Sequence, residues 1–138
     1  MQISAIIPVF NEEDHIIDAI ESVSWADEII VVDSFSTDKT LALAQSKGVK
    51  ILQRAYQYSA SQKNWAIPQA KYDWVFILDA DERVNESLKE EILKLKKDQC
   101  SNSERIARKY SAVGWSKVLK REDQEFKPLY GQYFFRPF

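Results

Sequence analysis

The sequence predicts an α/β fold, in which helices cover a mostly parallel β-sheet. Four short apolar runs of strand character alternate with four segments of helical periodicity, and each run is followed by its helix. Strands joined through such helices run parallel, because the helix carries the chain back across one face of the sheet. The 138 residues suffice for one domain with its own core, and 45% hydrophobic with 29% charged residues is typical of a globular protein.

The first strand and helix are predicted at residues 3–9 and 11–23. The strand is the apolar run ISAIIPV, which Pro8 stops, and its continuous apolar character suits a strand buried on both faces. The helix begins with acidic residues, which the helix dipole favours in a first turn. Its apolar side chains recur at helical spacing and are Ile16, Ile17, Ile20 and Val23.

The second strand, DEIIVVDS, is predicted at residues 27–34 and its helix at residues 36–48. Ser36 or Thr37 is predicted to cap this helix, since a side-chain oxygen there accepts a hydrogen bond from the free N–H groups of the first turn. Gly48 is predicted to end it, because glycine readily adopts the left-handed conformation common just after a helix.

The third strand, VKILQRA at residues 49–55, precedes a helix predicted at residues 59–70, and Pro68 limits the end of that helix. The fourth strand, DWVFILDAD, covers residues 73–81 and precedes a helix at residues 85–97. Asn85 is predicted to cap this last helix. The apolar side of the helix is predicted to consist of Leu88, Ile92 and Leu95.

The alternating pattern ends at Lys97 and divides the chain into residues 1–97 and 98–138. Segment 98–104 has the composition of a loop, and segment 105–126 is basic, with room for one helix and one strand. Residues 1–88 hold 7 Lys and Arg against 14 Asp and Glu, whereas the remaining residues hold 12 against 7. We therefore expect the two parts to face different partners.

The cysteine content and the N-terminal segment predict a cytoplasmic protein. The single cysteine, Cys100, excludes an internal disulfide and favours a reducing compartment. The first residues, MQISAIIPVFNEED, lack the basic region of a signal peptide. No apolar run approaches the roughly 18 residues that a membrane-spanning helix needs.

Polar residues end three of the predicted strands. In an open parallel sheet, ligands bind beyond the carboxyl ends of the strands, so neighbouring strands would bring together Asn11, Glu12, Asp33, Asp79 and Asp81. Asp79 and Asp81 repel one another unless a cation lies between them. Two hard carboxylates suit Mg²⁺ or Mn²⁺, which takes further ligands from water and phosphate. This pattern predicts a cation that holds a diphosphate; a helix cap or a solvated acidic turn is the alternative.

The segments IIPVFNEE, DEIIVVDSFSTDKT, QKNWAI and DWVFILDADERV together resemble the motifs of the family 2 glycosyltransferases, which have the GT-A fold. The resemblance covers residues 2–97 in matching order. It is nearest to the small bacterial enzymes that build lipopolysaccharide core and other surface glycans. It implies an enzyme that moves a sugar from a nucleotide-diphospho-sugar, by preference a UDP-sugar, to a glycan or lipid-linked acceptor, normally with inversion. A receiver-like signalling domain is disfavoured, because the third strand ends without a phosphoacceptor aspartate.

The resemblance also assigns roles to residues of the site. Pro8, Phe10 and Glu12 match the motif beside the nucleotide base and ribose, and Asp33, with Ser34 beside it, matches the acid that reads the base edge. The residues that match the polar helix facing the diphosphate are Lys63 and Asn64. The metal-binding Asp-x-Asp is matched by Asp79, which also contacts the nucleotide-sugar, and by Asp81.

Three of these assignments have simpler explanations. Asp33 would also serve as a cap for the following helix. Lys63 would also be a solvated helical lysine, and Glu12 has a reason to occupy a first helical turn in the helix dipole alone. His15, with no partner acid or cysteine in view, is interpreted as a surface or packing residue.

The family's catalytic base, a carboxylate that takes the proton of the acceptor hydroxyl, lies downstream of the Asp-x-Asp. Here we expect that region to be absent or compressed, because members of the family are usually substantially longer. The pair 114–115, Gly-Trp, is similar to a family element, but the acid that follows it in relatives is missing. Glu122 and Asp123 are candidate replacements, with a solvated charged turn as the alternative. Donor binding is thus better supported than turnover, and a non-catalytic nucleotide-sugar-binding module is the alternative function.

The last stretch, residues 126–138, interleaves six aromatic residues with Lys127 and Arg136. Such a segment suits a peripheral contact with an anionic membrane, here at the inner face of the cell membrane, where a lipid-linked acceptor would be reached. The alternative is an aromatic cluster that packs on its own domain or on a second subunit of a homodimer. No nucleic-acid partner is expected.

Overall fold

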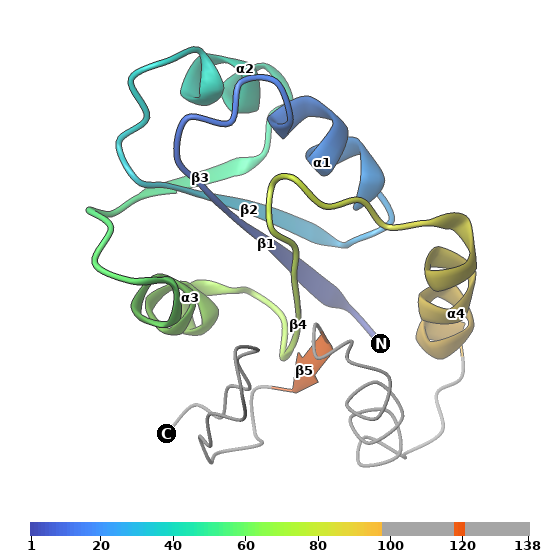
Figure 1. The fold of residues 1–138 in the computed structure, drawn as a ribbon. Helices are drawn as coiled ribbons and strands as arrows, with labels where there is room; N and C mark the ends of the chain where they lie inside the picture. The colour runs from blue at the N-terminus through green and yellow to red at the C-terminus, as the bar shows by residue number, and fades with distance from the viewer. Residues whose placement is uncertain (98–117, 121–138) are drawn as a thin grey trace.

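The computed structural model describes residues 1–97 and 118–120, which form a five-stranded sheet with helices on both faces (Figure 1). The strands are β1 (Ile3–Val9), β2 (Glu28–Asp33), β3 (Lys50–Gln53), β4 (Trp74–Ile77) and β5 (Val118–Lys120). Their order across the sheet is β3-β2-β1-β4-β5. The first four are parallel, which confirms the predicted sheet, and β5 pairs antiparallel with β4.

Helices follow the parallel strands in the predicted alternation. They are α1 (Ile16–Ser22), α2 (Thr40–Ser46), α3 (Ser59–Ala66) and α4 (Glu86–Lys97). A 3₁₀ turn, η1 (Ile67–Gln69), continues α3 at the point where Pro68, which has no N–H, prevents further α-helix. No helix of residues 1–97 is long and apolar enough to cross a membrane.

The core has two layers because successive side chains of a strand point to opposite faces of the sheet. On one face, Ile7 of β1 and Phe76 of β4 are buried with apolar residues of α1, α2 and α4. On the other face, Ile6 of β1 and Val75 of β4 are buried with α3 and η1. Figure 1 shows α3 across the sheet from α1 and α2. Since β1 is covered on both faces, its continuous apolar sequence is explained.

The sheet order brings together the ends of the three strands that carry the polar motifs. β1 lies between β2 and β4, with Val9 in register with Asp33. Pairing continues past β4, because the N–H of Leu78 donates to the carbonyl of Ile6 at 3.0 Å. Pro8 lies inside β1 and does not stop it, since the strand runs to residue 9.

Several predicted ends and caps are confirmed. Gly48 has φ +66°, the left-handed conformation predicted for it, and follows α2 closely. Asn85 caps α4, because its Oδ1 accepts a hydrogen bond from the N–H of Leu88 at 2.9 Å. Ile92 is buried in the core, as its place on the apolar side requires, whereas the side chain of Leu95 lies outside what the structure describes.

The predicted starts of two helices are wrong. α1 begins at residue 16 and not at 11, and α2 begins at 40 and not at 36. Ser36 and Thr37 therefore cap no helix; Lys39 stands at the cap position of α2 without a side-chain bond. The reason is tertiary, because the segments before both helices hydrogen-bond to one another.

Candidate functional site

Two loops at the carboxyl edge of the sheet are joined by reciprocal hydrogen bonds. In one direction, the N–H of Asn11 donates to Ser36 Oγ at 2.9 Å and the N–H of Glu12 to Thr40 Oγ1 at 2.8 Å. In the other, the N–H of Thr37 donates to Asn11 Oδ1 at 2.8 Å. Backbone N–H groups of both loops are thus bound by side-chain oxygens of the other loop, and this holds both chain segments in place.

Asp38 strengthens this link. Partial burial would raise the pKa of Asp38, but hydrogen bonds from the Thr40 hydroxyl and from the N–H groups of Thr40 and Glu13 outweigh it and lower that pKa below its ordinary value. Two loop residues other than glycine also have positive φ, Asn11 at 52° and Phe35 at 61°. Left-handed backbone costs an ordinary residue about 1–2 kcal/mol, so the surrounding bonds must hold it there.

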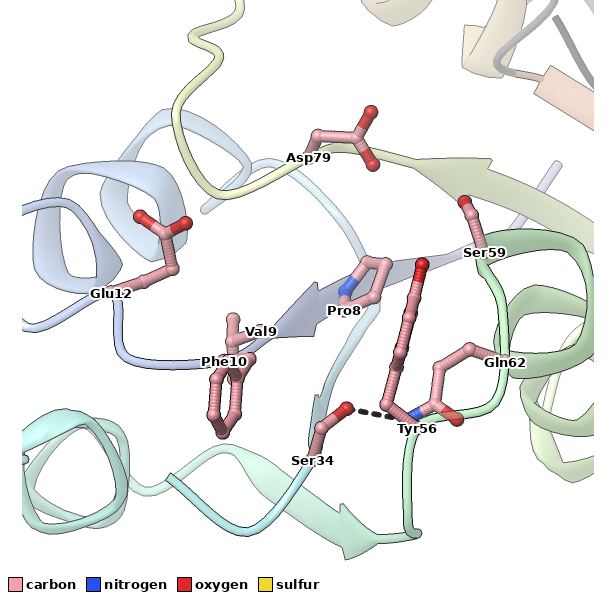
Figure 2. Close-up of a pocket in the computed structure, with 9 residues that line it drawn as sticks. All are labelled: Pro8, Val9, Phe10, Glu12, Ser34, Tyr56, Ser59, Gln62 and Asp79. Atoms are coloured by element: carbon pink, nitrogen blue, oxygen red, sulfur yellow. Dashed lines mark hydrogen bonds between the residues drawn. The ribbon is translucent and has the colours of Figure 1, made fainter. Parts of the chain in front are cut away.

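A pocket of about 200 Å³ opens beside these loops, at the carboxyl ends of β1, β2 and β4 (Figure 2). Its lining includes five residues predicted from the sequence to bind the nucleotide-sugar: Pro8, Phe10, Glu12, Ser34 and Asp79. It also includes four that the sequence did not single out: Val9, Tyr56, Ser59 and Gln62. Whole-ligand pockets usually measure about 300–1,000 Å³, so this one suits part of a larger ligand.

The wall of the pocket combines aromatic and polar groups. The side chains of Phe10 and Tyr56 are 56% and 60% exposed, so their rings are available to a ligand. Ser34 and Gln62 are both buried and are joined by a hydrogen bond of 3.0 Å. Glu12 and Asp79 provide carboxylates (Figure 2). A ligand with a flat ring, hydroxyl groups and a cation or cation-bound anion would match this lining.

Asp33 is close to the pocket but is not among its lining residues. Its carboxylate is fully buried, accepts hydrogen bonds from the N–H and hydroxyl of Ser36, and accepts a third from Gln53 Nε2 at 3.1 Å. These bonds shape the loop after β2 and are not a cap of α2, which starts further on. The predicted reading of a base edge by Asp33 stays a prediction.

Lys63 supplies a positive charge at the predicted metal site. Its Nζ lies 3.1 Å from Asp79 Oδ1, with the lysine side chain 13% and the aspartate side chain 50% exposed. Lys63 and Asn64 both lie on α3, as predicted, but neither lines the pocket, and Asn64 is exposed. One carboxylate of the Asp-x-Asp is therefore partly neutralised by the protein itself.

Asp79 and Asp81 lie on a tight turn that closes when the N–H of Glu82 donates to the carbonyl of Asp79 at 2.9 Å. The Glu82 side chain accepts a hydrogen bond from the N–H of Asp79 in return. Arg83 ties this turn to the segment before α1, since its guanidinium donates to the carbonyls of Ala80 and His15 at 2.7 and 3.2 Å.

The donor set fits a hard divalent cation. Asp81 is exposed, and Asp79 keeps a second oxygen that the bond to Lys63 does not use. Within the described residues there is no group of three or more His, Cys, Asp or Glu placed to hold an ion. Two carboxylates nevertheless suit Mg²⁺ or Mn²⁺, which usually completes its coordination with water and a ligand's phosphates. A structural metal held by protein alone is not supported.

His15 is exposed at the surface, as interpreted from the sequence, but the expectation that it has no partner acid is wrong. His15 has a partner acid, because its Nδ1 lies 2.8 Å from Glu12 Oε2, three residues earlier. The pair forms because residues 12–15 make a turn, in which the N–H of His15 bonds the carbonyl of Glu12, and not the first helical turn that the sequence predicted. Glu12 is thereby held at the pocket edge.

The sequence also missed Gln62, although it offered a signal. Gln62 and Ala66 are four residues apart on α3 and share its buried face. A polar residue on the core face of a helix needs partners or a ligand, so its position was informative.

Glu122, Asp123 and the aromatic segment 126–138 lie outside the described residues, and so do the rest of the predictions for residues after 97, apart from the one strand, β5.

The parallel sheet of order β3-β2-β1-β4, with the pocket and the Asp-x-Asp turn at its carboxyl edge, agrees with the GT-A fold of solved glycosyltransferase structures. The profile of Glycosyl transferase family 2 matches residues 4–136. The chain belongs to this family, as its motifs predicted.

Two relatives place the chain among bacterial glycosyltransferases. The lipopolysaccharide core biosynthesis glycosyltransferase LpsC of Rhizobium meliloti is 34% identical over 126 residues, which cover 88% of this chain and 43% of LpsC. A glycosyltransferase of Rickettsia bellii is 45% identical over 92 residues, which cover 66% of this chain and 31% of that protein. The chain therefore spans less than half the length of these relatives.

Solved structures agree with the fold. Staphylococcus aureus TarS in complex with UDP-GlcNAc gives a TM-score of 0.60 at 28% identity, covering 70% of this chain and 32% of that one. Glucosyl-3-phosphoglycerate synthase of Mycobacterium tuberculosis, in complex with Mn²⁺, UDP and glucosyl-3-phosphoglycerate, gives 0.53 at 28% identity, covering 58% and 33%.

Proposed function

We propose that this chain binds a nucleotide-diphospho-sugar, by preference a UDP-sugar, together with Mg²⁺ or Mn²⁺, and transfers the sugar to a glycan or lipid-linked acceptor in the synthesis of surface polysaccharide or lipopolysaccharide. The observation that carries the proposal is the pocket, which joins Phe10, Glu12, Ser34 and Asp79 from three separate strand ends. Similarity to LpsC supports the glycan class, and the UDP-bound relatives support the donor.

The pocket would hold the nucleoside end of the donor. Pro8, Phe10 and Tyr56 would contact the flat faces of the base and ribose, for which apolar and aromatic surfaces are suited. Glu12, which His15 keeps in position, would accept a hydrogen bond from a ribose hydroxyl. Orientation of the donor would thus come from residues that the two joined loops fix before binding.

Asp79 and Asp81 would hold the cation, and Lys63 would meet the diphosphate beside it. The cation's chemical role when bound is to offset the negative charge that grows on the departing nucleoside diphosphate. Because Glu12, Asp79 and Asp81 make this edge of the sheet acidic, a diphosphate would be repelled from it without added positive charge. This arrangement supports the proposed use of a cation, which would add to the positive charge of Lys63.

For the transfer step, a carboxylate of residues 98–138 would act as the base, with Glu122 and Asp123 as candidates. The base takes the proton of an acceptor hydroxyl as its oxygen attacks the anomeric carbon. The bond from that carbon to the diphosphate oxygen breaks on the opposite side, so the nucleoside diphosphate leaves and the configuration inverts. We also propose that segment 126–138 contacts an anionic membrane surface at the cytoplasmic face. Binding of the protein to anionic vesicles would test this contact.

Titration calorimetry with UDP, with and without Mn²⁺, tests the donor site. We expect Mn²⁺ to strengthen UDP binding to the wild type and to have no effect on Asp81→Ala. Glu90→Ala, a matched loss of an exposed carboxylate on α4, should behave as the wild type. UDP binding that ignores the metal in all three proteins would refute the proposal. Donor binding without release of sugar to any acceptor would favour the non-catalytic module.

A further inference from the structure

Arg83 follows the Asp-x-Asp turn and bonds the two backbone carbonyl groups that flank Asp81. Its Nη1 donates to the carbonyl of Ala80 at 2.7 Å and to the carbonyl of Glu82 at 2.6 Å. That nitrogen carries two hydrogens, so each carbonyl can receive one of them. Hydrogen bonds from a charged donor are stronger than those between neutral groups. One side chain therefore holds the backbone on both sides of Asp81.

The direction of the Asp81 side chain depends on this backbone. Asp81 is exposed, and among the described residues none forms a hydrogen bond or ion pair with its carboxylate. Asp79 differs, because its Oδ1 lies 3.1 Å from Lys63 Nζ. Lys63 thus orients the first carboxylate of the Asp-x-Asp directly, whereas the second is oriented by the path of the chain through the turn, which Arg83 holds.

The other half of the guanidinium reaches a part of the chain that is already in place. Its Nη2 donates to the carbonyl of His15 at 3.2 Å, and the exposed carboxylate of Asp18 lies 3.7 Å from the same nitrogen. His15 belongs to segment 12–15, whose first residue, Glu12, donates its N–H to Thr40 Oγ1 in the next loop. Figure 1 shows the chain between β4 and α4 passing beside the start of α1. Arg83 thus ties the turn to a segment that the loop after β2 fixes.

The charge of Arg83 does not explain its position. A guanidinium beside a turn that is proposed to hold a cation would repel that cation. The geometry of the side chain does explain it, because a planar fork spreads its donors over two nitrogens and here serves three carbonyl groups. A lysine carries the same charge on a single nitrogen and cannot reproduce this spread.

We infer that Arg83 is a positioning residue, whose guanidinium holds the turn that carries Asp81 against segment 12–15 and so aims the Asp81 carboxylate at the cation of the donor site. The inference rests on the proposed function and adds to it a residue that acts through Asp81 and touches neither the cation nor the donor.

The test is titration calorimetry of UDP, with and without Mn²⁺, on the wild type, Arg83→Lys and Asp18→Asn. Arg83→Lys keeps the charge and removes the fork, whereas Asp18→Asn removes the ion pair and leaves the bonds to the carbonyl groups. In Arg83→Lys the tightening of UDP binding by Mn²⁺ should be about tenfold smaller than in the wild type, since loss of a group that supports a metal ligand typically costs about 10–100-fold in metal affinity. UDP affinity without metal should be unchanged, and Asp18→Asn should behave as the wild type.

An undiminished effect of Mn²⁺ in a folded Arg83→Lys would overturn the inference and leave the proposed function standing. An equal loss in Asp18→Asn would do the same, and so would a loss in Arg83→Lys that is just as large without metal. A wild type whose UDP binding ignores Mn²⁺ would overturn both the inference and the proposed function.

Hydrogen–deuterium exchange of the wild type covers the case in which Arg83→Lys does not fold by circular dichroism. The N–H of Glu82 closes the Asp-x-Asp turn, and the N–H of His15 closes the turn of segment 12–15. If Arg83 ties the two turns together, both amides should exchange with the same protection free energy. A Glu82 amide that exchanges independently of His15, and much faster, would overturn the inference.

Discussion

Replacing Lys63 by methionine should strengthen the binding of a divalent cation. In the structure the Lys63 ammonium lies 3.1 Å from Asp79 Oδ1. A cation that binds Asp79 must displace this charge or tolerate it nearby. Lys63→Met keeps the length and apolar stem of the side chain and removes the charge, so Asp79 becomes available.

The size of the effect follows from the geometry. A partly exposed ion pair is worth roughly 0.5–1 kcal/mol. A divalent cation and an ammonium about 4 Å apart repel by about 2 kcal/mol when water screens them. Because Asp79 is 50% exposed, we use these screened values and not those of a buried pair. Because the metal meets only one of these two costs, removal of the lysine gains about 1–2 kcal/mol and predicts Mn²⁺ binding roughly tenfold tighter than in the wild type.

Electron paramagnetic resonance of free Mn²⁺ measures this affinity without nucleotide. Lys89→Met is the matched control, since Lys89 pairs with Glu86 at 3.4 Å on α4, away from the pocket. The same Lys63→Met protein should bind UDP more weakly in the absence of metal, because a cation that faces the diphosphate is lost. Unchanged or weaker Mn²⁺ binding in Lys63→Met would refute the idea that lysine and metal compete for one carboxylate.

Three further predictions concern stability and are checked by urea unfolding. Burial would raise the pKa of Asp27, but hydrogen bonds from Lys96 and from the N–H of Ile3 outweigh it and lower that pKa. The stability this gives is complete above the unfolded pKa of about 3.9 and is lost as pH falls through the lower folded value. Asp27→Asn should therefore destabilise the protein at pH 7, by an amount that shrinks below about pH 4; a gap that stays constant with pH would contradict this. Asn85→Ala should lower the free energy of unfolding by about 1 kcal/mol, through loss of the cap of α4, and a neutral result would mean that the cap bond contributes nothing. Gly48→Ala should cost about 1 kcal/mol because alanine is strained at φ +66°, although the added methyl group meets no atom within 4 Å; an equally stable variant would argue against that backbone geometry.

The sheet could be predicted from the sequence because its signal is local. The continuous apolar run of β1 and the helical spacing of Ile16 and Ile20 each depend on a few neighbouring residues. The same is true of Gly48 and Asn85, whose places at helix ends follow from their own chemistry. The motifs at three strand ends lie together because β1 lies between β2 and β4 in the sheet.

What could not be predicted depends on contacts between distant segments. The start of α1 was missed because Asn11 and Glu12 bond to residues about 25 positions away. The bond between Lys63 and Asp79 likewise joins α3 to the turn after β4. Likewise, the sequence does not indicate that Arg54 and Ser34 accept from the side-chain nitrogen of Gln62, or that its oxygen has no partner among the described residues. Residue propensities and the spacing of apolar residues along the sequence do not indicate which distant residues will bond to one another.

The reciprocal bonds between the loops after β1 and β2 have a consequence for how this edge of the molecule moves. Neither loop can detach while the other keeps its shape, since each supplies acceptors for the other's amide protons. The two should therefore open in a single cooperative event, and the amides of Asn11, Glu12 and Thr37 should exchange with solvent deuterium with one common protection free energy. Thermal fluctuation would then remove everything that these two loops contribute to the pocket, Phe10, Glu12 and Ser34, in a single step.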